Sequence, residues 1–472
     1  MEPRSSRGSR PIWSQSTALA GALALLLGAG APAAHGEDLA LLLTTLYVEP
    51  CTAPDQSMCP GVVLETSTLN GAPHAGHFQA DSLEELNSLT DTLAGSLGTF
   101  AFNSTVSSYT FDLELGVPVR TSDSLGPILS ERATTLGARR LNLGFSFNRI
   151  EFKRFEGDDL DDLTLFFDHE DVGGAPPDAM GNPVPDGMLG PTSFFPSDVE
   201  RDRIQVDLDI ELDQSVYTLY GTYGFLRNLD IGVAIPILDV GLKARASADV
   251  ERNAVGVAIA KGADCFPVLG GDGPPDCGTS ADVHKFADPP VPARAEDAMT
   301  SSVKGSAAGI GDILLRGKYH FLRSEEWRPN LAFVGQVKFP TGDEDNLLGT
   351  GDWRGMPMLV ADKTFGRVTP HLNLGYEIVG GDSELNNLKY FVGFDARVHP
   401  RFTAIIDLLG RWEPSGDGIG DNLIDLAIGG KVSVWRSAVL VANFIVPLNR
   451  NEGLRPDFVW ALGAEYTFGG AE

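Results

Sequence analysis

The sequence lacks the features of a helical membrane protein, a disulfide-rich protein and a nucleic-acid-binding protein. Its longest uncharged apolar run, Ala18 to Ala29, falls short of the roughly 18 residues that a membrane-spanning helix requires. Four cysteines in 472 residues are too few for a disulfide scaffold. Only 36 basic residues face 64 acidic ones, and such a surplus of negative charge would repel a phosphate backbone. We therefore expect no nucleic-acid partner.

Catalytic motifs are also lacking. The sequence contains no GxSxG elbow, HExxH pair, P-loop or GxGxxG turn after a strand. Its eight histidines are scattered, although His320 and His371 can be tested for Ser/His catalysis on the outer face of a barrel. The acidic runs at 157–162 and 342–346 are better explained as solvated loop residues than as cation sites. We expect no enzyme activity, no catalytic residue, no metal and no cofactor.

Residues 1–36 have the pattern of a secretory signal peptide. Three arginines precede the short apolar run, and Ala34 and Gly36 provide the small residues of a cleavage site. Cleavage there would place the mature N-terminus at Glu37. The alternative is an amphipathic or membrane-anchoring N-terminus. The pattern predicts export.

Export makes the cysteines informative, because disulfides form in oxidising compartments. Cys51 and Cys59 are close in sequence, and Cys265 and Cys277 flank a turn-rich segment. An even number at short spacing predicts two local disulfides. Four free thiols or long-range pairing remain the alternatives.

From residue 139 onward, apolar and polar residues alternate with a period of two. Ile204, Val206 and Leu208, for example, alternate with Gln205 and Asp207. Successive side chains of a strand point to opposite faces, so each segment has one apolar and one polar face. The alternation predicts about twelve strands, near residues 139–154, 201–226, 229–255, 309–322, 329–340, 354–364, 367–380, 387–398, 402–413, 421–435, 437–447 and 456–468.

Short and long connections alternate between these segments. Short turns fall near 227–228 and 399–401, whereas Asp- and Gly-rich connections fall at about 155–200 and 256–308. Outer-membrane barrels have this asymmetry, with short periplasmic turns and long external loops. We therefore predict an all-β fold, a transmembrane antiparallel up-and-down barrel over residues 139–468, whose long early strands project beyond the bilayer. A soluble β-solenoid or a pair of sandwich domains is the alternative.

The polar faces of the strands are expected to point into the barrel and either line a polar path or form an internal ion-pair network. Asp207, Asp209 and Glu211 belong to this inward set. Lys318 and Lys338 are expected at mid-strand, where exchange for Glu would favour cations without affecting folding. The lumen-lining candidates are Asp312, Arg316, Lys318, His320, Lys338, Lys389, Asp395, Arg397, Asp407 and Arg411.

The two ends of the mature chain have patterns of their own. Residues 37–138 form an N-terminal extension with leucines at helical spacing near 81–97 and a short alternating strand at 109–115. This extension is either periplasmic or a hatch inside the lumen. The C-terminal "GAEYTF" is similar to the recognition signal of outer-membrane barrels, although four residues follow it. The barrel-assembly machinery is therefore an expected partner.

Four segments resemble a known family: "GIGDILLRGKYHFL" (309–322), "VKFPTGDEDNLLGTG" (337–351), "HLNLGYEIVG" (371–380) and "LSERATTLGARRLNLGFSFNRIEF" (129–152). They are similar to outer-membrane β-barrels assigned to transport in the phenol meta-degradation pathway, and the likeness covers roughly residues 140–468. The resemblance implies a barrel that admits hydrophobic or aromatic compounds. It supplies no binding or catalytic residue, because its motifs concern architecture.

Three functions follow from these observations. The favoured one is an outer-membrane channel or transporter for passive uptake of small hydrophobic or aromatic solutes. The second is a structural or adhesive surface barrel that acts through its external loops, and the third is an outer-membrane enzyme. Outer-membrane lipids and lipopolysaccharide are expected partners in every case.

Overall fold

The structure is a computed structural model that describes residues 39–46, 109–112, 117–120, 124–168, 203–251, 286–287, 295–296, 298–381, 383, 385–414, 422–435 and 437–468. The expected signal peptide, the helix expected near 81–97 and the four cysteines lie outside these residues. In the described part of the chain, no helix is both long and apolar enough to cross a membrane.

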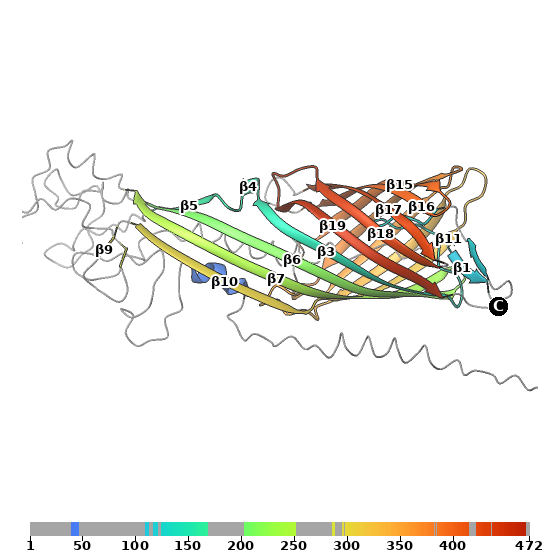
Figure 1. Cartoon of the computed structure of the whole chain (residues 1–472), viewed down its shortest axis with the longest axis horizontal. Coiled ribbons are helices and arrows are strands. Elements are labelled where there is room, and N and C mark those ends of the chain that lie inside the picture. Colours follow the sequence, from blue (N-terminus) through green and yellow to red (C-terminus); the bar gives the residue numbers. More distant parts are fainter. Residues whose placement is uncertain are drawn as a thin grey trace, which may run out of the picture. The chain divides into compact units, whose positions relative to one another are not determined.

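Twelve strands close into an antiparallel barrel (Figure 1). In chain order they are β3 (Leu141–Phe155), β6 (Arg203–Leu226), β7 (Leu229–Glu251), β11 (Ile313–Leu322), β12 (Asn330–Phe339), β13 (Arg354–Asp362), β14 (Val368–Val379), β15 (Asn387–His399), β16 (Phe402–Trp412), β17 (Asn422–Trp435), β18 (Ala438–Pro447) and β19 (Leu454–Phe468). Each strand pairs with the next, and β19 pairs with β3 to close the barrel. The predicted antiparallel all-β barrel is confirmed.

The alternation of residue types explains why these segments form barrel strands. Along β14, side chains are exposed and buried in turn over the whole strand. Leu372 and Leu374 face outward and are about half exposed, whereas His371 and Asn373 face inward and are buried. An apolar outer face and a polar inner face are the arrangement of membrane barrels.

The connections give the barrel two different ends. At the short-turn end, at most seven residues (323–329) join one strand to the next, and only residues 227–228 join β6 to β7. At the long-connection end, β3 leads to β6 and β7 leads to β11 through much longer segments. Trp353 and Trp412 are exposed at the long-connection end and Trp435 at the short-turn end, as expected for interfacial aromatic residues.

Strands β6 and β7 continue beyond the barrel at the long-connection end and form a sheet that we call the extension (Figure 1). Strand β5 (Leu163–Asp168) pairs with the start of β6, and β10 (Ala298–Ile310) pairs with the later part of β7. A two-residue strand, β4 (Asp158–Asp159), pairs with the end of β3. The expectation that 155–200 and 256–308 are only connections is therefore wrong, because β4, β5 and β10 lie within them.

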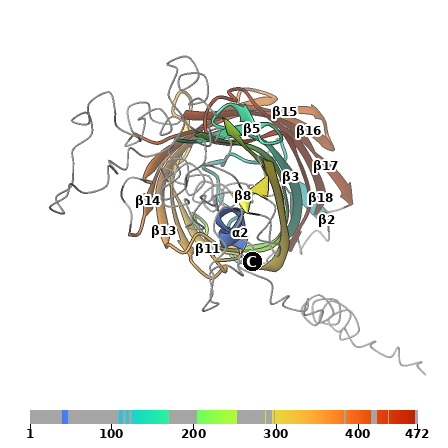
Figure 2. The same cartoon turned by 90° about the vertical axis from the view of Figure 1, so that its left-hand side faces the viewer.

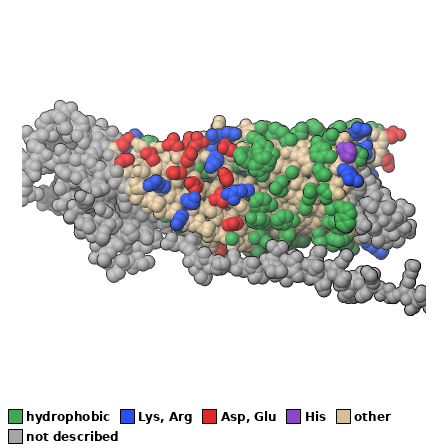
Figure 3. Space-filling model, viewed as in Figure 1, with side chains coloured by type: hydrophobic (Ala, Val, Ile, Leu, Met, Phe, Trp, Pro, Cys, Tyr) green, Lys and Arg blue, Asp and Glu red, His purple; other side chains and the backbone are tan. Residues whose placement is uncertain are grey.

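The polarity of the two faces inverts where the barrel becomes the extension. In the extension part of β6, the inner face carries Ile204, Val206 and Leu208, and the outer face carries Asp207 and Asp209. In the barrel part of the same strand, the outer face is apolar and the inner face is largely polar. Figure 3 shows this change as hydrophobic side chains over the barrel and charged side chains over the extension.

The inversion occurs at the same register in three neighbouring strands. The outward residues Phe147, Tyr217 and Ile237 pair across β3, β6 and β7, and two positions further along Arg149 and Asp239 lie in one row. Only an environment that changes from lipid to water favours such a switch. The prediction that the early strands project beyond the bilayer agrees with this register.

The inversion also corrects one expectation. Asp207, Asp209 and Glu211 were expected to point into the barrel, but they lie on the exposed outer face of the extension. The Glu211 side chain is 66% exposed and pairs with Lys243. Outside the bilayer, charged side chains face water and apolar side chains face inward, so the inward rule for polar faces is wrong for this part of β6.

Smaller elements complete the described residues. Helix α2 (Leu39–Thr45) lies beside β10, against the inner face of the extension (Figure 1, Figure 2). A Cβ added to Gly305 of β10 would lie 2.5 Å from both Leu39 Cδ2 and Leu42 Cδ1, so this glycine permits the close approach of the helix. Two small hairpins are formed by β1 (Tyr109–Asp112) with β2 (Val117–Arg120) and by β8 (Phe286–Ala287) with β9 (Ala295–Glu296).

Candidate functional site

Residues 124–136, which we call the plug segment, lie against the inward face of the barrel near its short-turn end. Leu125 and Ile128 are fully buried and pack in one apolar cluster with Ile405, Val439 and Val441. A second cluster joins Ala133 to inward residues of β12 and β13. These contacts hold the plug segment on two sides of the barrel, and polar contacts lie between them.

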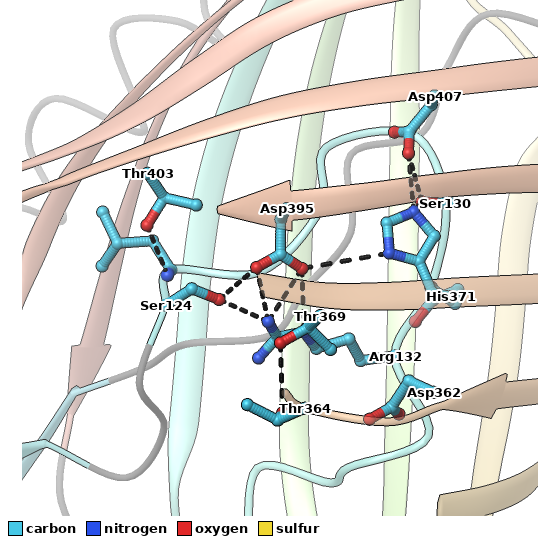
Figure 4. Close-up of polar contacts among 12 residues, drawn as sticks. Ser124, Ser130, Arg132, Asp362, Thr364, Thr369, His371, Asp395, Thr403 and Asp407 are labelled. Atoms are coloured by element: carbon cyan, nitrogen blue, oxygen red, sulfur yellow. Dashed lines mark hydrogen bonds and ion pairs between the residues drawn. The ribbon is translucent and has the colours of Figure 1, made fainter. Parts of the chain in front are cut away.

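The strongest polar contact of the plug segment joins Arg132 to Asp395 on β15 (Figure 4). Two guanidinium nitrogens of Arg132 donate to Asp395, and the terminal nitrogen lies 2.7 Å from Oδ1 and 2.6 Å from Oδ2. The hydroxyl of Ser124 donates to the same carboxylate. The two side chains are 3% and 0% exposed, so each charge depends on the other for its compensation.

Glu131 makes the second ionic contact of the plug segment. Its carboxylate lies 2.5 Å from an Arg316 nitrogen and 3.3 Å from Lys318 Nζ, both on β11. Burial alone would raise the pKa of Glu131, but the charges and hydrogen bonds of Arg316 and Lys318 outweigh it and lower the pKa to about 2. The Glu131 carboxylate thus holds the plug segment on the barrel wall, where it lies between two cationic side chains.

The low pKa of Glu131 gives a prediction for acid pH. Because the pKa falls from 4.5 in the free side chain to about 2 in the folded protein, the carboxylate favours docking above pH 4.5, and this contribution is lost as pH falls towards 2. The shift corresponds to about 3 kcal/mol. Protease cleavage of the plug segment should therefore increase only below pH 4.5. Glu131→Gln should abolish the dependence, and release near pH 6–7 would contradict it.

Ser130, His371 and Asp407 form a contact that superficially matches a catalytic triad. Ser130 Oγ lies 2.7 Å from His371 Nε2, but Asp407 Oδ1 lies 2.6 Å from the same nitrogen. Nδ1, which the aspartate of a triad must bind, lies 3.9 Å from Asp395. The His371 ring is fully buried inside the barrel. The arrangement therefore positions the plug segment and presents no nucleophile to a substrate.

The inward position of both histidines also overturns the idea that they act on the outer face of the barrel. His320 is 8% exposed and its Nε2 lies 2.9 Å from the carbonyl oxygen of Leu322. His371 belongs to the internal network described above. Neither ring reaches the lipid-facing surface, so the outer-face Ser/His hypothesis is wrong for these two residues.

Neutral and strand-end residues bind the backbone of the plug segment. The amide of Glu131 donates to Asn373 Oδ1 at 2.7 Å, and Asn373 returns a bond to the Glu131 carbonyl. Carboxylates at the strand ends accept bonds from Ala133 and Leu136 at 2.7 Å; they belong to Asp362 and Asp230. The sequence analysis missed these residues because nothing in the strand pattern indicates which inward side chains meet another segment.

Two of the motifs that carry the family resemblance, at 309–322 and 337–351, dock onto each other at the long-connection end. Asp312, from the Gly-x-Gly-Asp motif, accepts bonds from the amides of Gly342 and Thr350 at 3.0 and 2.9 Å. Thr341, from the Phe-Pro-Thr-Gly-Asp motif, donates to the Gly311 carbonyl at 2.8 Å. The motifs therefore fix the β12–β13 connection at the point where β10 gives way to β11.

A second set of charges lies near the long-connection end. Lys338 Nζ lies 3.5 Å from Asp312, and Glu377 lies 2.8 Å from Lys389 and 3.6 Å from Arg354. Arg411 pairs with Glu413, while Arg397 near the short-turn end is only half-buried. Among the ten lumen-lining candidates, most are therefore held in ion pairs, and the structure separates them into two groups.

This distribution corrects the mid-strand expectation for Lys338, which is the penultimate residue of β12. Lys318 does lie at the middle of β11, where it contacts Glu131 of the plug segment. A glutamate at position 318 would face Glu131, so we no longer expect this exchange to leave folding unaffected. Of the described residues, no group of three or more His, Cys, Asp or Glu side chains could hold a metal ion.

A family model described as "Putative MetA-pathway of phenol degradation" matches residues 196–413. No curated protein matches the sequence. An outer membrane channel from Pseudomonas putida F1 is 11% identical, with a TM-score of 0.38 over 71% of this chain and 98% of that chain. The Ralstonia pickettii toluene transporter TbuX is 9% identical, with a TM-score of 0.32 over 71% and 90% of the two chains.

A bacterial polysaccharide outer membrane secretin is 8% identical, with a TM-score of 0.29 over 70% of this chain and 98% of that chain. Since a secretin and a toluene transporter are matched almost equally well, these likenesses carry no argument about function. The family match includes the motifs at 309–322, 337–351 and 371–380. Over β6 to β16, the chain resembles the family of the MetA pathway of phenol degradation, as its motifs predict.

Proposed function

We propose that the protein is an outer-membrane channel for passive uptake of small hydrophobic or aromatic solutes. Its barrel spans the bilayer with the apolar outer belt in lipid, the short turns in the periplasm and the extension outside the cell. Residues 37–138 act as a hatch: helix α2 packs against the inner face of the extension, and the plug segment lies in the lumen near the periplasmic end. The signal peptide of residues 1–36 and the C-terminal signal direct export and barrel assembly.

One observation carries this proposal: a single apolar cluster runs from the inner face of the extension into the barrel. Its side chains are buried, and Leu129 of the plug segment packs against it. A continuous apolar surface stabilises apolar solutes by about 25 cal/mol per Å² of surface removed from water. Its members include Leu39, Leu42, Leu43, Phe152, Ile204, Val206, Leu208, Ile210, Leu242, Ala427, Ile445 and Val459.

The family match supports the same proposal, since its description concerns the degradation of phenol. The sequence lacks the common catalytic motifs, and Asp407 contacts Nε2 of His371 where a triad needs Nδ1; both observations favour a channel over an enzyme. An outer-membrane lipid-hydrolysis assay with the purified protein is the direct check for that activity.

Uptake measurements test the proposed function. A strain that lacks the protein should take up labelled toluene more slowly than the same strain complemented with the gene. Leu208→Asp, which places a charge in the apolar cluster, should lower this uptake, whereas Asp209→Asn on the exposed outer face should leave it unchanged. Equal uptake by the deleted and complemented strains would contradict a channel.

The alternative is a structural or adhesive surface barrel that acts through its external loops. The Arg132–Asp395 and Glu131–Arg316 contacts favour this alternative, because they hold the plug segment inside the lumen. Under this alternative, purified folded protein would show no conductance in planar bilayers even after the plug segment is released.

A further inference from the structure

One wall of the barrel interior differs from the rest. The wall formed by β19, β3, β6 and β7 carries small residues and neutral polar residues on its inner face, and Ser146 of β3 pairs directly with Thr218 of β6. The buried charges of these strands are each engaged: Glu465 pairs with Lys431 at 3.1 Å, Arg455 pairs with Asp425 at 2.5 Å, and Asp230 accepts the Leu136 amide at 2.7 Å. Gly463 and Pro236 flank the Ser146–Thr218 pair on β19 and β7. Around the Ser146–Thr218 pair, this wall therefore offers neutral hydrogen-bonding groups.

Several of these groups are buried without a hydrogen-bond partner. The side-chain nitrogen and oxygen of Gln214 and the hydroxyls of Ser146, Thr218 and Thr222 have none within the described residues. All four residues are at most 2% exposed. Buried polar groups are nearly always hydrogen-bonded, because an unsatisfied one costs about 1–3 kcal/mol. A row of four such residues is therefore suited to a molecule that hydrogen-bonds to them.

The row has a defined course through the membrane. Gln214 lies at the polarity inversion and pairs with Ile150 of the apolar cluster, and Thr222 lies opposite Gly232 near the plug segment. From Gln214 to Thr222 the strand covers about 27 Å, close to the height of the apolar belt of a membrane barrel. The row thus continues the apolar cluster down to the periplasmic end.

We propose that Gln214, Ser146, Thr218 and Thr222 line the path of the solute and select uncharged molecules that combine an apolar body with a hydroxyl or similar hydrogen-bonding group. This inference rests on the proposed channel function and narrows its substrate class. A pure hydrocarbon leaves the row unsatisfied, and an anion meets no uncompensated positive charge on it. A hydroxylated aromatic satisfies both the apolar cluster and the row.

The test compares probes of similar size in cells that lack the native protein. Labelled phenol, toluene and benzoate share an aromatic ring but differ in hydrogen bonding and charge. Wild-type protein should raise phenol uptake most and benzoate uptake least. The double variant Ser146→Ala, Thr218→Val removes two hydroxyls and should lower phenol uptake about tenfold while leaving toluene uptake unchanged or higher.

Controls separate the possible outcomes. Replacing unpaired buried hydroxyls by apolar groups of similar shape should not impair folding, which equal heat-modifiable migration on gels would verify. Ser302→Ala, on the exposed outer face of β10, should leave the uptake of all three probes unchanged. If the double variant leaves phenol uptake unchanged, or lowers toluene uptake equally, the selectivity proposal is overturned although the channel stands. If wild-type protein transports none of the probes, the proposed function fails as well.

Discussion

Replacing Asp395 with Asn is expected to release the plug segment and to increase the ionic conductance of the barrel severalfold. The substitution keeps the shape of the side chain but leaves the Arg132 guanidinium buried without its counter-charge. Removing one partner of a buried ion pair costs about 3–5 kcal/mol. Planar-bilayer conductance and protease cleavage within residues 124–136 would both report the release.

A matched control is available on the extension. Glu211 and Lys243 form an ion pair of 2.6 Å whose side chains are each 66% exposed, and such surface pairs contribute only about 0–1 kcal/mol. Glu211→Gln should therefore change neither conductance nor proteolysis. The role assigned to Asp395 is wrong if Asp395→Asn behaves like this control. Arg132→Met should reproduce the Asp395→Asn effect, because it leaves the Asp395 carboxylate buried without its counter-charge.

The second large effect concerns the boundary between membrane and water. Val233→Arg should destabilise the folded barrel in vesicles by about 2–4 kcal/mol, the cost of an arginine near the midplane on a lipid-facing strand position. Val233 lies on the outer face of the barrel part of β7 and is 40% exposed. The urea midpoint for unfolding from lipid vesicles measures the effect.

Asp249→Arg provides the comparison on the same strand. Asp249 also faces outward and is exposed, but it lies in the extension, beyond the polarity inversion between Ile237 and Asp239. An arginine there faces water, so its effect should stay within about 0.5 kcal/mol. Equal destabilisation by the two substitutions would show that the inversion does not mark the membrane boundary.

The twelve barrel strands could be predicted from the sequence because their signal is local. Alternation such as that of Leu372 and Leu374 with His371 and Asn373 reports the two environments of a strand residue by residue. Short and long connections then indicate a barrel, since membrane barrels have turns on one side and loops on the other. The family motifs at Asp312 and Thr341 could be recognised for the same reason, as continuous stretches of sequence.

Local alternation does not say which face points inward. Asp207 and Asp209 follow the same pattern as the barrel strands, yet they face water, because β6 leaves the bilayer between Asp213 and Tyr217. The pattern fixes the period of the strand, and the surrounding medium fixes its polarity. Only the register of β3, β6 and β7 shows where that medium changes.

The sequence by itself determined the all-β fold, the approximate number and positions of the barrel strands and the lack of recognisable catalytic motifs, because each of these depends on residues close in the chain. The tertiary structure alone decided how the interior is closed. Arg132 and Asp395 are separated by 263 residues, and Glu131 and Lys318 by 187, so no local pattern relates them. They meet because closing the barrel brings inward faces of distant strands around one segment, where buried charges must find partners.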